Sequence, residues 1–152
     1  YYTSDLVMVV KKGGKYENAT KLSDFKGATI TGQLNTFHYT VIDQIDGVKK
    51  DTAMDNFPAM RVALESGKID GYVSERPEGV SATSANKNFA MVEFKEGQGF
   101  KTSDEDTAIA VGLKKDSDLK DKINKILAGI SEDERKDLMD QAIKDQPASE
   151  DN

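Results

Sequence analysis

The sequence contains 152 residues, a length typical of one domain that buries about two-thirds of its surface. Hydrophobic residues make up 37% and charged residues 32% of the chain, a composition that excludes intrinsic disorder and favours a soluble, highly charged domain. The net charge of -6, from 21 basic and 27 acidic residues, excludes nucleic acid as a favoured partner, because no positive field attracts a polyanion.

The chain has no cysteine and a single histidine. We therefore expect no disulfide, no metal site, no cofactor and no cysteine nucleophile. No apolar run approaches the roughly 18 residues that a membrane helix needs. The chain starts at Tyr1 rather than at methionine, so we expect a segment of a longer protein from which any signal or anchor has been removed.

The first third of the chain predicts two strands and the loops that leave them. Residues 6–10 are continuously apolar and rich in valine, which predicts a buried, central strand, and two glycines follow as a turn. Residues 22–25 predict a short helical turn, and residues 28–31 a second strand. Residues 32–35 form the loop that leaves this strand.

The middle of the chain predicts two helices and a third strand. Apolar residues at helical spacing predict a helix over residues 36–45. Asn56 is typical of an N-cap, with Pro58 in the first turn, and Gly67 is typical of the C-terminal end of the same helix. Residues 69–73 follow as a strand.

The last part of the chain predicts further alternation. Residues 77–86 form a helix opened by proline, and residues 89–94 a strand. Residues 96–106 are polar, which predicts a connector. Residues 107–113 are apolar, which predicts another strand. An apolar stripe over residues 119–130 predicts an amphipathic helix.

A final helix begins at Ser131, which forms a capping-box pattern with Glu134, and the tail at residues 146–152 is expected to fray. Strands alternating with helices indicate an α/β fold with much parallel pairing. Such sheets bind ligands at the carboxyl ends of their strands. That rule selects two loops, residues 32–38 and residues 74–77.

The first loop contains residues able to hold a small anion. Backbone N–H groups at a helix N-terminus, together with the Thr36 hydroxyl, are typical of a carboxylate site. The alternative is that Asn35 or Thr36 only caps the helix. His38 falls in the first helical turn, where the macrodipole disfavours a charged imidazole, so it is expected to pack or contact a ligand rather than act as a base.

The second loop contains an acid at the end of a strand. The Glu75 carboxylate, which follows Ser74, would accept hydrogen bonds from an ammonium group. The alternative is a salt bridge between Glu75 and Arg76 or another neighbour. Together the two loops complement a zwitterionic amino acid.

Three stretches, in the order of the family, resemble the type 2 periplasmic solute-binding proteins of the polar amino-acid branch that serves ABC importers. They are YYTS at 1–4 followed by LVMVVKK at 6–12, LSDFKG at 22–27 followed by ATI, and LESGKIDG at 64–71. The resemblance extends over nearly the whole chain. It implies a lobe with a mixed, mostly parallel sheet flanked by helices, plus the C-terminal part of an incomplete first lobe.

The resemblance also implies a set of ligand-binding residues and no catalytic ones. The family's carboxylate-binding Gly-Thr pair corresponds to Asn35 and Thr36, and its ammonium-binding aspartate corresponds to Glu75. The implied ligand contacts are Gln33, Asn35, Thr36, Phe37, His38, Ser74 and Glu75. Because Glu75 is acidic, a polar or basic amino acid is weakly favoured.

The implied organisation has three parts. Residues 1–5 end a first-lobe segment, residues 6–94 form the second lobe with the crossing strands, and residues 95–152 return to the first lobe. Apolar surface on this incomplete lobe would favour a homodimer of the chain.

The implied function is capture of a free amino acid between two lobes, as the binding component of an ABC importer. The expected partners are the ligand and ABC permease subunits. The expected location is extracytoplasmic, with a lipid anchor or a fused permease in the parent protein. The alternatives are an enzyme on the same fold, similar to cyclohexadienyl dehydratase, and an amino-acid sensor domain.

Overall fold

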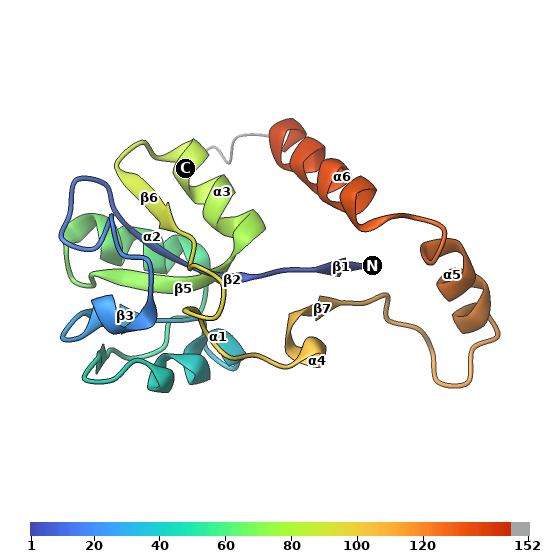
Figure 1. The fold of residues 1–152 in the computed structure, drawn as a ribbon, viewed down its shortest axis with the longest axis horizontal. Helices are drawn as coiled ribbons and strands as arrows, with labels where there is room; N and C mark the ends of the chain where they lie inside the picture. Colours follow the sequence, from blue (N-terminus) through green and yellow to red (C-terminus); the bar gives the residue numbers. More distant parts are fainter. Residues whose placement is uncertain (147–152) are drawn as a thin grey trace.

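The computed structural model describes residues 1–146. Its strands are β1 (Tyr2–Thr3), β2 (Leu6–Lys11), β3 (Thr29–Thr31), β4 (Lys49–Lys50), β5 (Gly71–Glu75), β6 (Phe89–Val92) and β7 (Ala108–Ile109). Its helical segments are η1 (Leu22–Phe25), α1 (Phe37–Thr40), η2 (Val41–Gln44), α2 (Phe57–Ser66), α3 (Arg76–Ala85), α4 (Asp104–Thr107), α5 (Leu119–Leu127) and α6 (Glu132–Asp145). Figure 1 shows a body built on one sheet, here called the sheet domain (residues 6–92), and an extension, here called the C-terminal arm (residues 104–146).

The sheet has five strands in the order β4-β3-β5-β2-β6. β3 is parallel to β4 and β5, whereas β2 is antiparallel to β5 and β6, so the expected mixed sheet is confirmed. The parallel pairings lie in the half of the sheet that carries the two predicted loops. The first residue of β2, Leu6, pairs with the last residue of β5, Glu75. The carboxyl ends of β3 and β5 therefore lie at the edge of the sheet where the chain enters from β1.

Two apolar clusters cover the two faces of the sheet, because side chains alternate along each strand. Met8 and Val10 of β2 pack with residues of η1, β3 and η2, including Phe25, Ile30 and Ile42. On the opposite face, Val9 packs with residues of α2, β5 and α3, including Met60, Tyr72 and Ala82. The predicted central strand at residues 6–10 is confirmed, with all five of its side chains buried.

Local capping signals locate α2 correctly. The Asn56 side-chain oxygen accepts a hydrogen bond of 2.9 Å from the Ala59 amide, and proline lies in the first turn. Gly67 ends the helix with a φ of 80°, a left-handed conformation that glycine adopts without steric cost. The capping box at Ser131 and Glu134 likewise begins α6.

Four other expectations need correction. The helix predicted over residues 36–45 is divided into α1 and η2, each of four residues. The third strand starts later and extends through Glu75, so Ser74 and Glu75 end the strand rather than follow it. The connector at residues 96–106 contains the start of α4. The strand predicted over residues 107–113 is wrong beyond β7, because its partner β1 has only two residues with which to pair.

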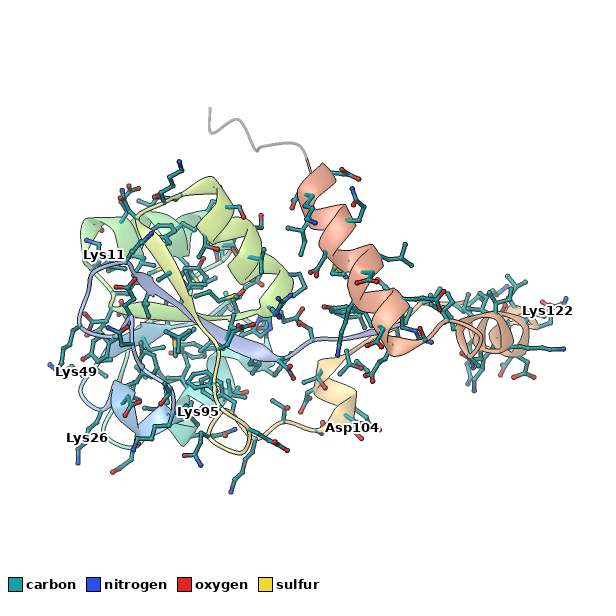
Figure 2. The ribbon with its side chains drawn as sticks, turned by 45° about the horizontal axis from the view of Figure 1, so that its top comes forward. Lys11, Lys26, Lys49, Lys95, Asp104 and Lys122 are labelled. Atoms are coloured by element: carbon teal, nitrogen blue, oxygen red, sulfur yellow. The ribbon has the colours of Figure 1, made fainter. Side chains whose placement is uncertain are left out.

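The C-terminal arm leaves the sheet domain next to the N-terminal strand. β1 pairs with β7, and α5 and α6 extend beyond this pair (Figure 1). Figure 2 shows Lys122 on α5 at the opposite end of the molecule from Lys11, Lys26 and Lys49. Neither α5 nor α6 buries a residue. The predicted amphipathic helix thus forms over residues 119–127, and its apolar stripe is at most half-buried.

α6 lies beside α3 and touches it through a few side chains. Arg76 donates to Asp140 at 3.5 Å, and Ser81 lies 3.4 Å from Gln146. A groove of about 960 Å³ remains between α2, α3 and α6, and Met139 and Ile143 line it from α6. Among the helices of residues 1–146, none combines the length and the apolarity that crossing a bilayer requires. The fraying expected of the tail at residues 146–152 falls, apart from Gln146, on residues outside those described.

Candidate functional site

The two predicted loops meet at one edge of the sheet. β3 and β5 are parallel neighbours, with Ile30 opposite Gly71 and Thr31 opposite Tyr72, so both strands end on the same side. The first loop follows β3, and His38 from that loop reaches the end of β5. His38 Nε2 lies 3.4 Å from Glu75 Oε1.

The first loop is held tightly against the start of α1. A side chain at Gly32 would lie 2.8 Å from the His38 carbonyl oxygen, so only glycine allows this close approach. The backbone of Gln33 forms an isolated parallel β-bridge with Met54, and the Gln33 side-chain amide donates to the Asp55 carbonyl at 3.3 Å. Asn35 has a φ of 60°, the left-handed conformation that asparagine tolerates.

Thr36 stands at the N-cap position of α1, but its hydroxyl does not cap the helix. The hydroxyl instead donates to the Gln33 carbonyl at 2.8 Å, which closes the loop on itself. Since α1 is only one turn long, its dipole is smaller than that of the ten-residue helix expected from the sequence.

His38 is held in an aromatic environment beside the acid. Its ring lies 4.6 Å from that of Phe37 and 6.5 Å from that of Phe57, measured between centroids. Only 9% of the His38 side chain is exposed, and its buried Nδ1 has no hydrogen-bond partner in the described residues. His38 therefore presents one nitrogen to Glu75, while its other nitrogen is buried.

Glu75 faces the edge of the sheet, with 24% of its side chain exposed. Its partner is His38 and not Arg76, which forms ion pairs with Glu93 at 2.9 Å and with Asp140 at 3.5 Å. The Arg76 amide donates to the Asp5 carbonyl at 3.0 Å and fixes the backbone just after Glu75.

Ser74 points in the opposite direction and is fully buried. Its hydroxyl donates to Glu78 Oε2 at 2.7 Å and also lies 3.2 Å from the Glu75 carbonyl. Of the seven predicted residues, the structure thus places Gln33, Asn35, Thr36, Phe37 and His38 along the first loop and Glu75 beside it, with Ser74 underneath.

Sequence reasoning missed the polar network beneath Glu75. Arg61 on α2 and Tyr72 on β5 join Ser74 in contacting Glu78 on α3. Burial raises the pKa of Tyr72, and the nearby Glu78 carboxylate raises it further. Burial opposes the charge of Arg61, but the hydrogen bond and charge of Glu78 outweigh that effect and raise the pKa of Arg61.

Arg61 and Glu78 are 17 residues apart on different helices, so no local pattern indicates their pairing. No cluster of three or more residues able to hold a metal ion occurs within residues 1–146.

Solved structures were found with the same arrangement of strands and helices. A substrate-binding protein of an amino acid ABC transporter from Streptococcus pneumoniae, bound to L-arginine, matches with a TM-score of 0.75 over 95% of this chain at 24% identity. The chain therefore has the fold of the substrate-binding proteins of amino acid ABC transporters. An ancestral arginine-binding protein bound to glutamine matches with a TM-score of 0.63 over 95% of the chain, also at 24% identity.

The chain spans 58% of the first of these proteins and 59% of the second. Domain 2 from TmArgBP, of T. maritima, gives a different coverage: 65% of this chain aligns with 99% of that domain, with a TM-score of 0.52 and 20% identity. The remaining part of the chain thus lies outside that domain. No protein-family model matches the sequence, and no curated protein matches it.

Proposed function

We propose that the chain belongs to the amino-acid-binding component of an ABC importer and carries the half of the ligand site contributed by one lobe. The observation that carries this proposal is the approach of His38 and Glu75 to 3.4 Å at the edge of the sheet where β3 and β5 both end. The edge lies on the side of β1 and β7, where a second lobe would face it.

The ligand is a free amino acid held without covalent chemistry. The Glu75 carboxylate accepts hydrogen bonds from its ammonium group. The loop from Gln33 to Thr36 receives its carboxylate, and the Thr36 hydroxyl turns from the Gln33 carbonyl to donate to it. Phe37 and His38 form the wall next to the ligand side chain. A polar or basic ligand is favoured because Glu75 is acidic and because the neighbours named above hold arginine or glutamine.

The proposed division of the chain keeps three parts. Residues 1–5 end a first-lobe segment, residues 6–94 form the second lobe with the crossing strands, and residues 95–152 return to the first lobe. The near-complete alignment of an isolated domain 2 with only 65% of this chain supports this division. In this function the partners are ABC permease subunits, the location is extracytoplasmic, and a lipid anchor or fused permease holds the parent protein.

Exposed apolar side chains on the C-terminal arm also favour a homodimer of the 152-residue chain. These side chains are Val111, Leu113, Leu119, Ile126 and Leu138. Light scattering is expected to detect dimers at high protein concentration, more strongly at high salt, which screens the repulsion between negatively charged copies. A monodisperse monomer at all salt concentrations contradicts the dimer.

The experiment that tests the binding function is a titration with amino acids followed by NMR and by thermal shift. L-arginine, L-glutamine and a set of other amino acids are added to the chain and to Glu75→Ala. We expect shifts at the amides of residues 33–38 and 75–76 with millimolar to micromolar affinity, since one lobe lacks the contacts of closure. A longer protein with the first lobe restored is expected to bind more tightly and to melt at a higher temperature with its ligand.

Glu93→Ala is the matched control, because Glu93 is a nearby acid that pairs with Arg76 on the surface. Binding that is lost in Glu75→Ala and kept in Glu93→Ala supports the proposal. Three results contradict it. The first is an equal loss of binding in both variants, and the second is that neither the 152-residue chain nor the longer protein binds any amino acid. The third is submicromolar binding by the single lobe.

A further inference from the structure

Glu78 accepts hydrogen bonds from side chains on two different elements, α2 and β5. It lies in the first turn of α3, and 15% of its side chain is exposed. Oε1 accepts hydrogen bonds from Arg61 Nε at 3.1 Å and Nη2 at 2.7 Å. Oε2 accepts the bond of 2.7 Å from the Ser74 hydroxyl, and the Tyr72 hydroxyl lies 3.4 Å from both oxygens. α2, β5 and α3 are thus joined at one carboxylate.

A buried carboxylate is costly unless it is paired and hydrogen-bonded, and Glu78 satisfies both requirements. The network is directional, because each Glu78 oxygen faces a different element. Arg61 holds one oxygen from α2, and the other oxygen is directed at Ser74. The carboxylate is therefore fixed in orientation as well as in position.

The network ends one residue before the proposed ligand-binding acid. Successive side chains of a strand point to opposite faces, so a Ser74 side chain held inward directs the Glu75 side chain outward. On the other side of Glu75, the bond from the Arg76 amide to the Asp5 carbonyl fixes the backbone. Glu75 is thus held between two anchored residues while its carboxylate faces His38.

We infer that Glu78 is a positioning residue for ligand binding: through Ser74 it holds the end of β5 so that Glu75 presents its carboxylate beside His38. This inference rests on the proposed function. It assigns Ser74 a supporting contact from below instead of a direct contact with the ligand. A purely structural ion pair between Arg61 and Glu78 would change stability but leave the affinity of the folded protein unaltered.

The test compares three variants of the network with a matched control. Glu78→Gln removes the charge, Ser74→Ala removes only the link to β5, and Glu78→Asp retains the carboxylate on a shorter side chain. Glu65→Gln is the control. Glu65 and Glu78 both line the groove between α2, α3 and α6, but Glu65 contacts Asn86 instead of Ser74. All variants are compared at a temperature at which circular dichroism shows each one folded.

The first measurement is the dissociation constant for L-arginine and L-glutamine by NMR titration. We expect about tenfold weaker binding in Glu78→Gln and in Ser74→Ala, as the loss of a hydrogen bond to a charged group implies. Glu78→Asp is expected to recover part of the affinity, and Glu65→Gln to stay within about twofold of the original chain. The double variant of Ser74 and Glu78 is expected to be no weaker than either single variant, because both act through one contact.

The second measurement needs no ligand. Hydrogen exchange of the Arg76 amide reports on the end of β5, and we expect it to become about tenfold faster in Glu78→Gln and unchanged in Glu65→Gln. If the chain binds no amino acid, the proposed function fails, while faster exchange at Arg76 still supports positioning of the strand end by Glu78. Unchanged exchange overturns the inference in either case. Additive effects of Ser74→Ala and Glu78→Gln on affinity also overturn it, because they indicate direct contact of Ser74 with the ligand.

Discussion

The sheet domain buries most of its large apolar side chains, whereas no apolar side chain of the C-terminal arm is buried. Residues 6–10 are buried along the whole of β2, and both faces of the sheet carry a cluster of buried side chains. In the arm, α5 and α6 are regular helices in which no residue is buried. The comparison shows that an amphipathic pattern is enough to form a helix here but does not supply the surface that buries it.

Charge also differs between these two regions. The sheet domain, residues 6–92, contains eleven basic and ten acidic residues, whereas the C-terminal arm, residues 104–146, contains eight basic and twelve acidic residues. Self-repulsion of like charges opposes close packing of such a segment on itself. The sheet domain thus contains a buried core, while the arm combines exposed apolar side chains with excess negative charge.

The largest expected effect contrasts two leucines on helices of the two regions. Leu64 on α2 is fully buried, and Leu138 on α6 is 62% exposed. Leu64→Ala is expected to cost about 2–5 kcal/mol of unfolding free energy, and Leu138→Ala less than about 0.5 kcal/mol. Urea unfolding followed by circular dichroism measures both. A comparable cost for Leu138→Ala would show that α6 is buried against a partner in solution.

An intermediate effect is expected from alkaline pH, and it concerns the sheet domain. Burial raises the pKa of Tyr72 above its ordinary value of 10.0, so the folded state keeps a proton that the unfolded chain loses. The stability due to this proton is complete below pH 10.0 and is lost as the pH rises above that value.

Tyr72→Phe keeps the ring and removes the ionisable group, so its stability is expected to fall less steeply above about pH 10. Urea unfolding at several pH values from about 8 to 11.5 gives the two profiles. The pKa of Tyr2 is also raised by burial, so the variant is expected to retain a smaller alkaline loss. Identical profiles for the two proteins would contradict the assignment to Tyr72.

The features predicted from the sequence are those with local causes. Asn56 and Gly67 locate α2 because capping depends on neighbouring backbone groups. The approach of the two loops was also predicted, because parallel strands end on the same side of a sheet.

Features that depend on distant partners escaped prediction. The apolar run at residues 110–113 resembles a strand but finds no strand to pair with in the described residues. The contacts of Glu78 join separate helices and a strand, so its importance is visible only after folding. Ser74 was expected in a loop, but the ladder between β2 and β5 extends the strand through Glu75.

The smallest effect comes from removing one helix cap in each region. Asn56→Ala removes the bond to the Ala59 amide in α2, and Ser131→Ala removes the capping box of α6. Each cap is worth about 1 kcal/mol to its own helix. Only the loss at Asn56 is expected to appear in global unfolding, because α2 packs on the sheet and α6 buries no residue.

The loss of stability in Ser131→Ala is expected to be confined to α6. Hydrogen exchange should become faster in α6 and stay unchanged in β2. It has a second signature, because hydrogen bonds from the backbone amide and hydroxyl of Ser131 lower the pKa of Glu134. In Ser131→Ala that pKa is expected to rise toward its ordinary value, which NMR titration of the carboxyl group measures. If Ser131→Ala lowered the global stability as much as Asn56→Ala does, the arm and the sheet domain would unfold together, and the contrast between the two regions would not hold.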